Sequence, residues 1–366
     1  MTRTTPPRPV DVTAIFPELA PFARTAYRLH PRNGAPTAHD SSVGGPLLWP
    51  AEEPWPSCAG PHEWDKPKPV RGDHAESLEG VRTTRRLLRE EASRPGPRAE
   101  RLRPEEREAL RQANARVPWP ANPVPMLPVA QLWARDVPLP GLFAGTDVLQ
   151  VLWCPFDHDE DGKPYPRVTL RRRTAADVTD VLAEPPRPAS VQYSGYVPEP
   201  CLLAPERVTE YPNLMELALL EPGLAEEIEG ESRWEAAGVR LDALVAEHPD
   251  LDPDDAERYE DLYRCALSLA PGWKAGGWST WGRTDPVDRP CPACGTPAEP
   301  LLTLASTEAY GDSGTWIPYE DRDLVRWGHG DVESGNQAAL TLGDCDTLQL
   351  HACPADPAHP FVDLVQ

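Results

Sequence analysis

The sequence has no long apolar run. Nothing in its 366 residues approaches the ~18 consecutive apolar residues that a membrane-spanning helix needs. No apolar segment typical of a secretory signal follows the opening residues Met1-Thr-Arg-Thr-Thr-Pro-Pro7. These absences predict a cytoplasmic protein that does not bind membranes. In a reducing compartment its eight cysteines are expected to be metal ligands or buried thiols, not disulfides.

The short motifs of several large enzyme classes are also missing. The chain contains no Gly-x-Ser-x-Gly, no Gly-x4-Gly-Lys-[Ser/Thr], no Gly-x-Gly-x-x-Gly and no His-Glu-x-x-His. Its 58 carboxylates are too numerous for any one pair to stand out. The sequence therefore names no catalytic residue, and a catalyst is the less favoured class.

Basic residues are few relative to acidic ones, at 36 Lys and Arg against 58 Asp and Glu, which gives a net charge of -22. Residues 65–116 hold 14 basic and 10 acidic residues, so the remaining chain carries -26. Such a surface disfavours nucleic acid and anionic membranes, and it suits a basic protein client. The alternative is that the acidity only keeps the protein soluble.

Proline is abundant, at 47 residues, but the chain also contains 12 tryptophans and a hydrophobic fraction of 40%. Disordered chains lack that many aromatic residues, so the composition indicates a folded protein with many turns and short strands. The length exceeds what a single core usually supports, since cores stop growing near ~250–300 residues. Two lobes are expected.

One stretch occurs twice: Asp147-Val-Leu-Gln-Val-Leu-Trp-Cys-Pro155 returns as Asp346-Thr-Leu-Gln-Leu-His-Ala-Cys-Pro354, with five of nine positions identical. In each copy, apolar residues alternate in the period-2 pattern of a strand with one apolar face. Proline cannot extend a sheet ladder, so each strand is predicted to end at Cys-Pro.

The repeat extends beyond this strand. Gly44-Gly45 and Gly276-Gly277 each precede an acid-Pro pair and a cysteine, and Met126–Gln131 aligns with Leu301–Ser306 as an apolar strand. We therefore predict an α+β fold: two pseudo-symmetric antiparallel-sheet lobes, products of an internal duplication, joined by a helical block. The predicted domains are an N-terminal extension (1–40), a first sheet lobe (41–212) with a charged insertion (65–121), a helical connector (213–271) and a second sheet lobe (272–366).

Further elements follow from local patterns. A helix is predicted over Pro17–Tyr27, and strands over Gly314–Pro318 and Ala338–Leu342. The connector is expected to contain several helices, the first of them broken at Pro222-Gly223. The insertion is expected to form two helices with thin apolar stripes, as a solvated appendage.

Cysteine and histidine are grouped by the repeat. The first half pairs Cys58-x3-His62 with Cys154-x3-His158, and the second pairs Cys291-Pro-Ala-Cys294-Gly with Cys353-x5-His359. Thiolate and imidazole at such spacings are typical of four-coordinate zinc, so zinc is predicted in each lobe. The alternative is buried thiols and exposed histidines. Cys345 and His351 could replace a missing ligand, whereas Cys201 and Cys265 are expected in the core.

Gln150, Gln349 and Gln131 stand among apolar strand residues. A buried amide lowers stability unless its hydrogen bonds are met, so a structural role joining strand and loop is expected, with ligand binding as the alternative. The tryptophans near the turns are expected to pack the lobes, or to anchor a protein partner if they face solvent.

Together these pieces resemble the YwqG-like family of uncharacterised bacterial proteins, in the form common in actinobacteria. The ordered set covers most of residues 40–366 outside the insertion. It consists of Gly44-Gly-Pro-x-x-Trp-Pro50, the strand ending at Gln131, Asp147-x-Leu-Gln-x-x-Trp-Cys-Pro155, Ala204-Pro-Glu-Arg-Val-Thr-Glu-Tyr-Pro212, Gly272-Trp-Lys-x-Gly-Gly-Trp278, Cys291-x-x-Cys-Gly295, Leu301–Ser306 and Cys353-Pro-x4-His359.

YwqG-like proteins are distantly similar to eukaryotic programmed-cell-death-2 proteins, which act as cytoplasmic adaptors or chaperones. The resemblance implies a duplicated, sheet-rich protein without catalysis that holds a partner polypeptide. The insertion of this chain is charged and has no cysteine, so the identity of the partner does not carry over.

Three functions remain open at this point: a chaperone-like adaptor, an accessory protein whose zinc only fastens turns, and a metalloenzyme with an open Cys/His site. The number of protein ligands separates them. Four ligands indicate a structural site, and three ligands plus water indicate a catalytic one.

Overall fold

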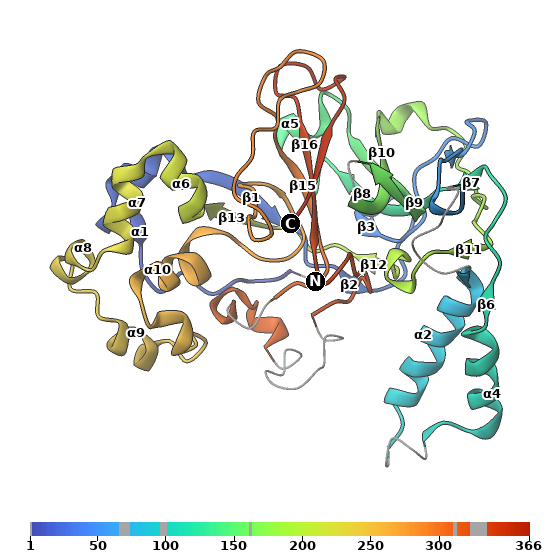
Figure 1. Ribbon diagram of the computed structural model, residues 1–366, viewed down its shortest axis with the longest axis horizontal. Coiled ribbons are helices and arrows are strands. Elements are labelled where there is room, and N and C mark those ends of the chain that lie inside the picture. The colour runs from blue at the N-terminus through green and yellow to red at the C-terminus, as the bar shows by residue number, and fades with distance from the viewer. Residues whose placement is uncertain (1, 66–73, 96–100, 161–162, 310–312, 323–334) are drawn as a thin grey trace.

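The computed structural model describes residues 2–65, 74–95, 101–160, 163–309, 313–322 and 335–366. Two six-stranded sheets form its centre, with a block of helices on one side and a helical hairpin on the other (Figure 1). The predicted mixture of helices and antiparallel sheets is thereby confirmed. Within the described residues, no helix has both the length and the apolar character needed to cross a membrane.

Sheet 1 is antiparallel throughout. Its strand order is β13 (Glu206–Glu210), β1 (Arg24–Arg28), β14 (Lys274–Gly276), β15 (Glu299–Ala305), β16 (Thr347–Ala352) and β17 (Val362–Val365). Alternation along β16 places Leu348 and Leu350 in the main core.

Sheet 2 is also antiparallel. Its strand order is β10 (Lys163–Arg173), β9 (Val148–Glu160), β8 (Leu127–Trp133), β3 (Ser42–Val43), β12 (Cys201–Leu202) and β2 (Arg32–Asn33). On β9, Leu149, Val151 and Trp153 face the main core, as predicted. The opposite face of β9 buries Leu152 and Phe156 in a second apolar cluster, so this strand is covered on both sides. The prediction of a single apolar face is therefore wrong for β9.

The two sheets exchange strands at their edges. The chain runs from β1 in sheet 1 through Leu29 to β2 at the edge of sheet 2, and from β12 in sheet 2 through Ala204 to β13 at the edge of sheet 1. The two crossings touch, because the Ala204 N–H donates to the Leu29 carbonyl at 2.9 Å. One hydrophobic core therefore contains residues of both sheets. The predicted N-terminal extension (1–40) supplies strands to both of them.

Four strands have the same order in the two sheets: β3, β8, β9 and β10 in sheet 2, and β14, β15, β16 and β17 in sheet 1. The register shifts directly after Pro128 in β8 and after Pro300 in β15. Gln131 lies opposite Gln150, and Thr303 lies opposite Gln349. The alignment of Gln131 with Ser306 made from the sequence is therefore wrong by three residues.

The buried glutamines join strands to the loops after the glycine pairs. Gln349 Nε2 donates to the Thr280 carbonyl (2.7 Å), and its Oε1 accepts from the Thr280 N–H (2.9 Å). In sheet 2, Gln150 Nε2 donates to the Leu48 carbonyl (2.9 Å), while Gln131 Oε1 accepts from the Leu48 N–H (2.7 Å). These bonds satisfy otherwise costly buried amides and confirm the expected structural role.

Smaller elements complete the sheet region. A three-stranded sheet contains β11 (Ser190–Val191), β5 (Ala75–Ser77) and β6 (Arg116–Val117), and a two-stranded one contains β4 (Ser57–Cys58) and β7 (Val124–Pro125). The short helices of this region are η2 (Glu63–Asp65), α5 (Pro140–Phe143), η3 (Ala175–Asp177), η4 (Ser194–Tyr196), η7 (Gly314–Trp316) and η8 (Tyr319–Asp321).

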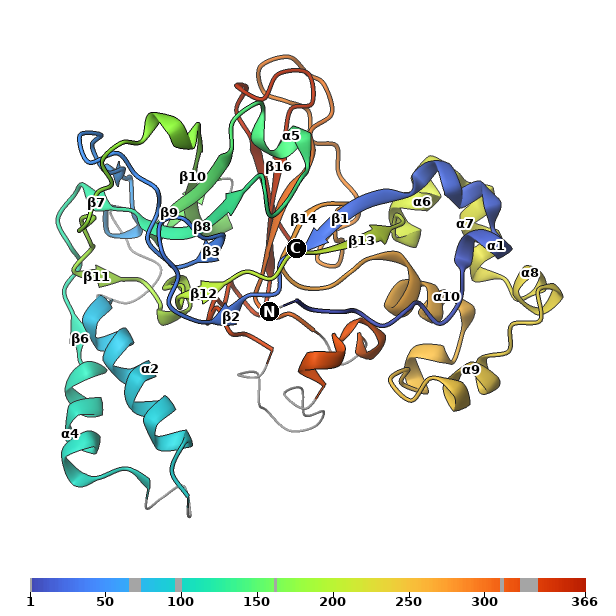
Figure 2. The same cartoon turned by 180° about the vertical axis from the view of Figure 1, so that it is seen from behind.

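The charged insertion forms a hairpin of α2 (Leu78–Ala92) and α4 (Pro104–Ala113), which projects away from the sheets (Figure 2). Ser77 caps α2 by accepting from the Gly80 N–H. The expectation of a solvated appendage is wrong for the start of α2, because Leu78 and Val81 belong to the main core. Residues 66–73 and 96–100 of the insertion lie outside the described part.

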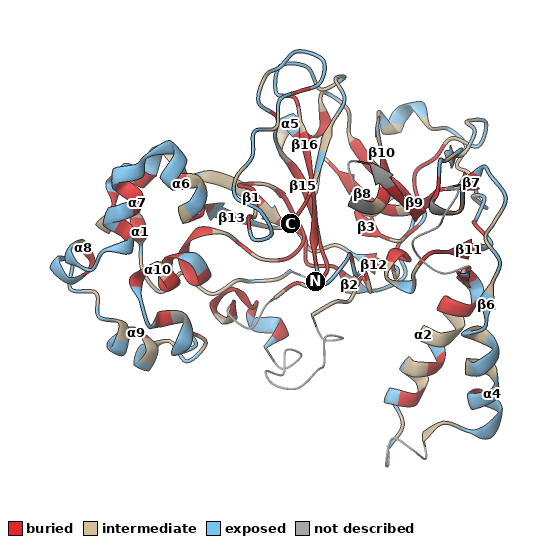
Figure 3. Cartoon of the chain, in the orientation of Figure 1, coloured by how far each residue is buried: buried red, intermediate tan, exposed pale blue. Residues whose placement is uncertain are grey.

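The connector forms a helical block with its own core. Its helices are α6 (Leu214–Leu220), α7 (Pro222–Glu229), α8 (Ser232–Ala236), α9 (Leu241–Glu247), η5 (Asp254–Ala256), α10 (Tyr259–Leu262) and the π-helix η6 (Tyr263–Ser268). The N-terminal helices α1 (Val12–Ile15) and η1 (Pro17–Phe22) pack on it, and Phe16 contacts Trp234 edge-on. The predicted break at Pro222 is confirmed. The outward surface of this block is largely exposed (Figure 3).

The predicted helix over Pro17–Tyr27 is wrong in its second half. Only η1 (Pro17–Phe22) is helical, and Arg24–Arg28 forms β1. Pro21 removes a helical N–H, and β1 instead pairs with a strand on each side. Tertiary pairing therefore outweighs the local pattern.

Two predicted strands are also wrong. Gly314–Pro318 contains the 3-10 helix η7, which buries Trp316. Ala338–Leu342 is irregular, because the Asn336 side chain bonds both backbone groups of Leu340 and Ala339 has φ of 50°. A strand accommodates neither feature.

The predicted strand end at Cys154-Pro155 is wrong as well, since β9 continues to Glu160. A register shift between Pro166 and Val168 moves Pro155 out of the ladder, and the Pro155 carbonyl accepts from Gln192 instead. The second copy behaves as predicted, because β16 ends at Ala352, directly before Cys353.

Candidate metal centres

Cluster 1 comprises Cys58, His62, Cys154 and His158, all buried, with their ligand atoms within 4.8 Å of one another. Cys58 ends β4, His62 follows in the next turn, and both Cys154 and His158 lie on β9. His62 Nε2 is 3.3 Å from Cys154 Sγ, and His158 Nε2 is 3.6 Å from Cys58 Sγ. The long β9 thus brings both of its ligands under the β4 turn.

The second nitrogen of each histidine in cluster 1 faces an oxygen. His158 Nδ1 lies 3.0 Å from the Pro61 carbonyl, to which it is placed to donate. His62 Nδ1 lies 3.6 Å from Asp65 Oδ2, and the same carboxylate accepts the His62 N–H. Such partners orient imidazoles so that the other nitrogen is left for a metal ion. Both Nε2 atoms accordingly point at the thiols.

Aromatic rings cover cluster 1. Trp64 stacks on His62 with 4.3 Å between ring centroids, and Trp119 stacks on Trp64 at 5.0 Å. Phe156 meets Trp64 edge-on at 4.7 Å. A site enclosed in this way keeps water and substrates away from the ligands.

The two thiols of cluster 1 have pKa values shifted in opposite directions. The pKa of Cys58 lies far below its ordinary value, chiefly through a hydrogen bond from Cys154 and further through His158 and His62. The pKa of Cys154 is raised by the same bond and by burial. Since the thiolate is the form that binds metal, this half of the chain offers one ready ligand and one that releases a proton on binding.

Cluster 2 comprises Cys291, Cys294, Cys353 and His359, whose ligand atoms also lie within 4.8 Å of one another. Cys294 Sγ is 3.5 Å from Cys353 Sγ, and His359 Nδ1 is 3.5 Å from Cys291 Sγ. Cys294 is exposed and His359 is half-buried, so this cluster is more open to solvent than cluster 1.

Local turns build cluster 2. The Gly295 N–H donates to the Cys291 carbonyl and the Cys291 N–H to the Thr296 carbonyl, both at 2.8 Å, which closes the Cys-Pro-Ala-Cys-Gly knuckle. Gly295 has φ of 73°, a conformation that favours glycine. The Thr296 hydroxyl and N–H lower the pKa of Cys294 to about 6, with a further contribution from Cys353. The knuckle therefore favours the metal-binding form of this thiol.

The structure brings together all eight residues singled out in the sequence, in the same two groups of four. Cys345 and His351 belong to neither group. Cys345 is exposed, and His351 is buried next to the Ser279 hydroxyl at 3.0 Å. Burial and Arg289 lower the pKa of His351 to about 3. Cys201 and Cys265 are buried, as expected.

The tryptophans near the turns serve packing. The buried ones are Trp49, Trp133, Trp153, Trp273, Trp278 and Trp281. They do not form the solvent-facing cluster that a protein-binding anchor requires.

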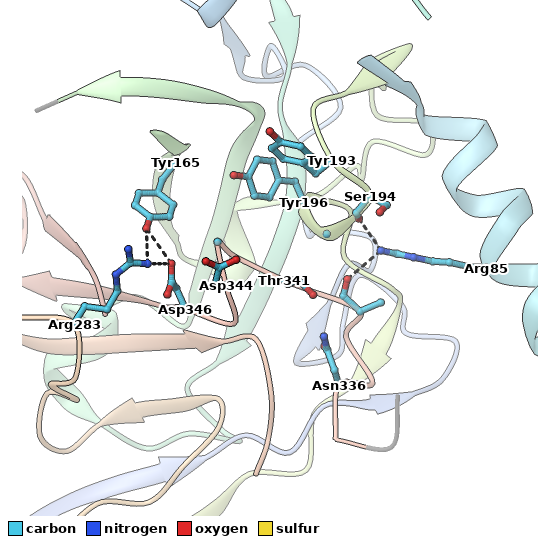
Figure 4. Close-up of a pocket in the computed structure, with 13 residues that line it drawn as sticks. Arg85, Tyr165, Tyr193, Ser194, Tyr196, Arg283, Asn336, Thr341, Asp344 and Asp346 are labelled. Carbon is cyan, nitrogen blue, oxygen red and sulfur yellow. Dashed lines mark hydrogen bonds and ion pairs between the residues drawn. The ribbon is translucent and has the colours of Figure 1, made fainter. Parts of the chain in front are cut away.

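One feature had no signal in the sequence: a cavity of about 820 Å³ between residues 193–196, the 336–346 segment and Arg85 in the middle of α2 (Figure 4). Arg85 bonds the Ser194 and Ala339 carbonyls at 2.7 and 3.0 Å. Burial raises the pKa of Tyr165, and so does its hydrogen bond to Asp346, to which it donates at 3.0 Å. The lining residues come from separate segments of the chain, so no local motif predicts the cavity. Arg85 and Tyr165 bond the backbone or another lining side chain.

The chain matches no model of a protein family, and no curated protein matches it. Each of the two clusters is positioned to hold one metal ion.

Proposed function

We propose that this protein is a non-catalytic, cytoplasmic protein-binding module in which each cluster holds one structural zinc ion. The observation that carries the proposal is the ligand count: four Cys and His donor atoms lie within 4.8 Å of one another in each cluster. Cys2His2 and Cys3His are the donor sets of structural zinc, which is four-coordinate and tetrahedral. When bound, zinc supplies a cross-link between segments far apart in sequence.

The metalloenzyme alternative requires three protein ligands and an open position for water. In cluster 1 a fourth protein ligand occupies that place, and Trp64 stacks directly on His62. In cluster 2 the fourth ligand is also a protein side chain. The geometry thus favours structural zinc over catalytic zinc in both halves of the chain.

The proposal includes an internal duplication. It is supported by the shared order of four strands in the two sheets and by the register shifts after Pro128 and Pro300. It is also supported by Gln150 and Gln349, which bond the backbone of residues at the same distance from the paired glycines. Two equivalent Cys/His clusters are what such a duplication would leave. The resemblance to YwqG-like proteins agrees with this origin.

The partner class follows from charge. With 58 acidic and 36 basic residues, the chain attracts polycations and repels nucleic acid and anionic membranes. A basic protein client is the partner most strongly attracted by this negative charge. Such a client agrees with the adaptor role that the family resemblance implies. The rival accessory role, with zinc only fastening turns, requires no client.

Affinity capture tests the proposal. We expect the immobilised full-length protein to retain a basic protein from native cytosol at low salt and to release it when salt rises from ~50 mM to ~500 mM, because screening weakens attraction between surfaces. Recovery of nothing above background at low salt would support the accessory role instead. A column carrying an unrelated protein of equal net charge controls for simple ion exchange.

A further inference from the structure

Helix α6 (Leu214–Leu220) exposes an unusual amount of apolar surface. Met215 is 39% exposed, Leu219 67% and Leu220 46%. The described residues contain three other exposed large hydrophobic side chains, all outside the helical block: Leu202, Val287 and Tyr319. Met215 and Leu219 are four positions apart, so they lie on the same face of the helix. Contiguous exposed apolar side chains of this kind mark interaction sites.

A cavity begins where this apolar face ends. It measures about 350 Å³ and lies between the helical block and sheet 1. Leu214 and Met215 line one side, and Leu269, Trp281 and Trp316 line other parts of the wall. Met215 therefore belongs both to the exposed face and to the cavity. A partner that covers α6 can place an apolar side chain in this cavity without rearranging the fold.

Acidic residues are concentrated in the helical block that contains α6. From Leu214 to Ser268 the chain carries 16 Asp and Glu against 4 Arg, a balance of -12 within a total of -22. Exposed carboxylates follow α6 directly, at Glu221, Glu226 and Glu229. Among the described residues, none of these three forms an ion pair. The four arginines of the block, by contrast, are each paired with an acid of the block or with Glu18: Arg233, Arg240, Arg258 and Arg264.

We propose that α6, together with this cavity, is the docking surface for a basic amphipathic segment of a partner protein. The segment would place its apolar residues over Met215 and Leu219 and its Lys or Arg residues against Glu221, Glu226 and Glu229. Helix-on-apolar-surface recognition of this kind uses anchors at three-to-four spacing. This inference rests on the proposed protein-binding function and assigns that function to one place.

The charge balance selects this occupant. A second copy of the chain would bring the same acidic block against itself, and like charges across an interface oppose association. An anionic membrane or a nucleic acid is repelled for the same reason. A basic segment with an apolar face satisfies both features of the surface at once.

A defined probe tests the assignment with the full-length protein. The probe is a fluorescein-labelled peptide of about 14 residues, or about four helical turns, built from Leu at three-to-four spacing and Lys elsewhere. Its counterpart has Glu in place of every Lys. Fluorescence anisotropy measures the affinity of both peptides. We expect the Lys/Leu peptide to bind, with an affinity that falls as salt rises, and the Glu/Leu peptide to bind at least about tenfold more weakly.

Matched variants locate the site. Met215→Gln combined with Leu219→Gln should weaken binding of the Lys/Leu peptide by about tenfold or more, because two apolar contacts are lost. Val287→Gln removes an apolar side chain that is 47% exposed and lies outside the block, and it should leave binding unchanged. Glu221→Gln, Glu226→Gln and Glu229→Gln together should weaken binding about threefold or more and flatten its salt dependence. All five positions in the helical block are exposed, so each variant is expected to keep the native melting temperature.

The possible results distinguish a failure of the assignment to α6 from a failure of the proposed protein-binding function. If Met215→Gln/Leu219→Gln binds the Lys/Leu peptide and captures a basic protein from cytosol as the native chain does, the assignment to α6 is overturned and the protein-binding function stands. Equal binding of the Lys/Leu and Glu/Leu peptides also overturns it. If the native chain captures no basic protein at low salt, the function and the assignment fail together.

Discussion

The Cys154→Ala variant is expected to contain one zinc ion per chain where the native protein contains two, and to be much less stable. Cys154 is 0% exposed and is one of four ligands in cluster 1. Structural zinc contributes ~10–16 kcal/mol of binding free energy in small domains, which is comparable to the whole stability of a typical domain. Loss of the ion should therefore unfold the β4 turn around cluster 1 and lower the melting temperature by on the order of 10 °C or more.

Cys201→Ala is the matched control. Cys201 is also 0% exposed, but it belongs to neither cluster. Its replacement should leave two zinc ions and cost about 1 kcal/mol, the usual effect of a small change in the core. Elemental analysis and thermal melting of the two variants together decide the matter. If Cys154→Ala keeps both ions, or melts where Cys201→Ala does, cluster 1 is not a zinc site.

The second large effect is expected for Lys274→Met, which should lower the free energy of unfolding by ~3–5 kcal/mol. Lys274 on β14 and Glu210 on β13 are both 0% exposed, and the ammonium lies 2.8 Å from each carboxylate oxygen. Glu210 also accepts the N–H groups of Ala270 and Trp278. Removal of Lys274 leaves a buried carboxylate without its counter-charge at the turn of the second glycine pair.

The same turn explains why Gly277 is glycine. Its φ is 76°, and a Cβ built there would lie 2.2 Å from Glu210 Oε2. Urea unfolding of Lys274→Met and of Arg240→Met gives the comparison. Arg240 pairs with Asp242 on the surface, where each side chain is more than 70% exposed, so its loss should cost less than ~1 kcal/mol. If the two variants were equally stable, the buried pair would not hold this turn.

The two Cys/His clusters were predictable from sequence because their residues lie at recognisable turns and strand ends. Short spacings such as Cys291-Pro-Ala-Cys294 place two donors in one turn, and the repeated strand places Cys154 and Cys353 at matching points. Because the two copies share their landmarks, the repeat indicated which cysteines and histidines lie close together in space. The same argument predicted the structural role of Gln150.

Other features depend on contacts that a single sequence does not display. Leu78 at the start of α2 lies in the main core, although the apolar stripe of this helix is thin. Arg85 in the middle of α2 bonds carbonyls more than 100 residues away. The strand β1 overrides a helical pattern through pairing on both of its edges. Pro155 lies within a long strand because a bulge removes it from the ladder. In each case a distant partner decides the local structure.

The docking surface on α6 shows a third situation. The sequence of Leu214–Leu220 shows its leucines, but this pattern is as typical of a fully buried helix as of a helix with an exposed apolar face. Only the structure shows that Leu217 is buried while Leu219 is exposed. The surrounding acidity then gives the exposed face a preferred class of partner.

X-ray absorption spectroscopy at the zinc edge of the native protein tests the central claim most directly. Two zinc ions per chain held by clusters 1 and 2 together have five sulfur and three nitrogen ligands. We therefore expect an average of four ligands per zinc, with more sulfur than nitrogen and Zn–S distances near ~2.3 Å. A protein purified without zinc at neutral pH, or a spectrum dominated by oxygen ligands, would contradict the account.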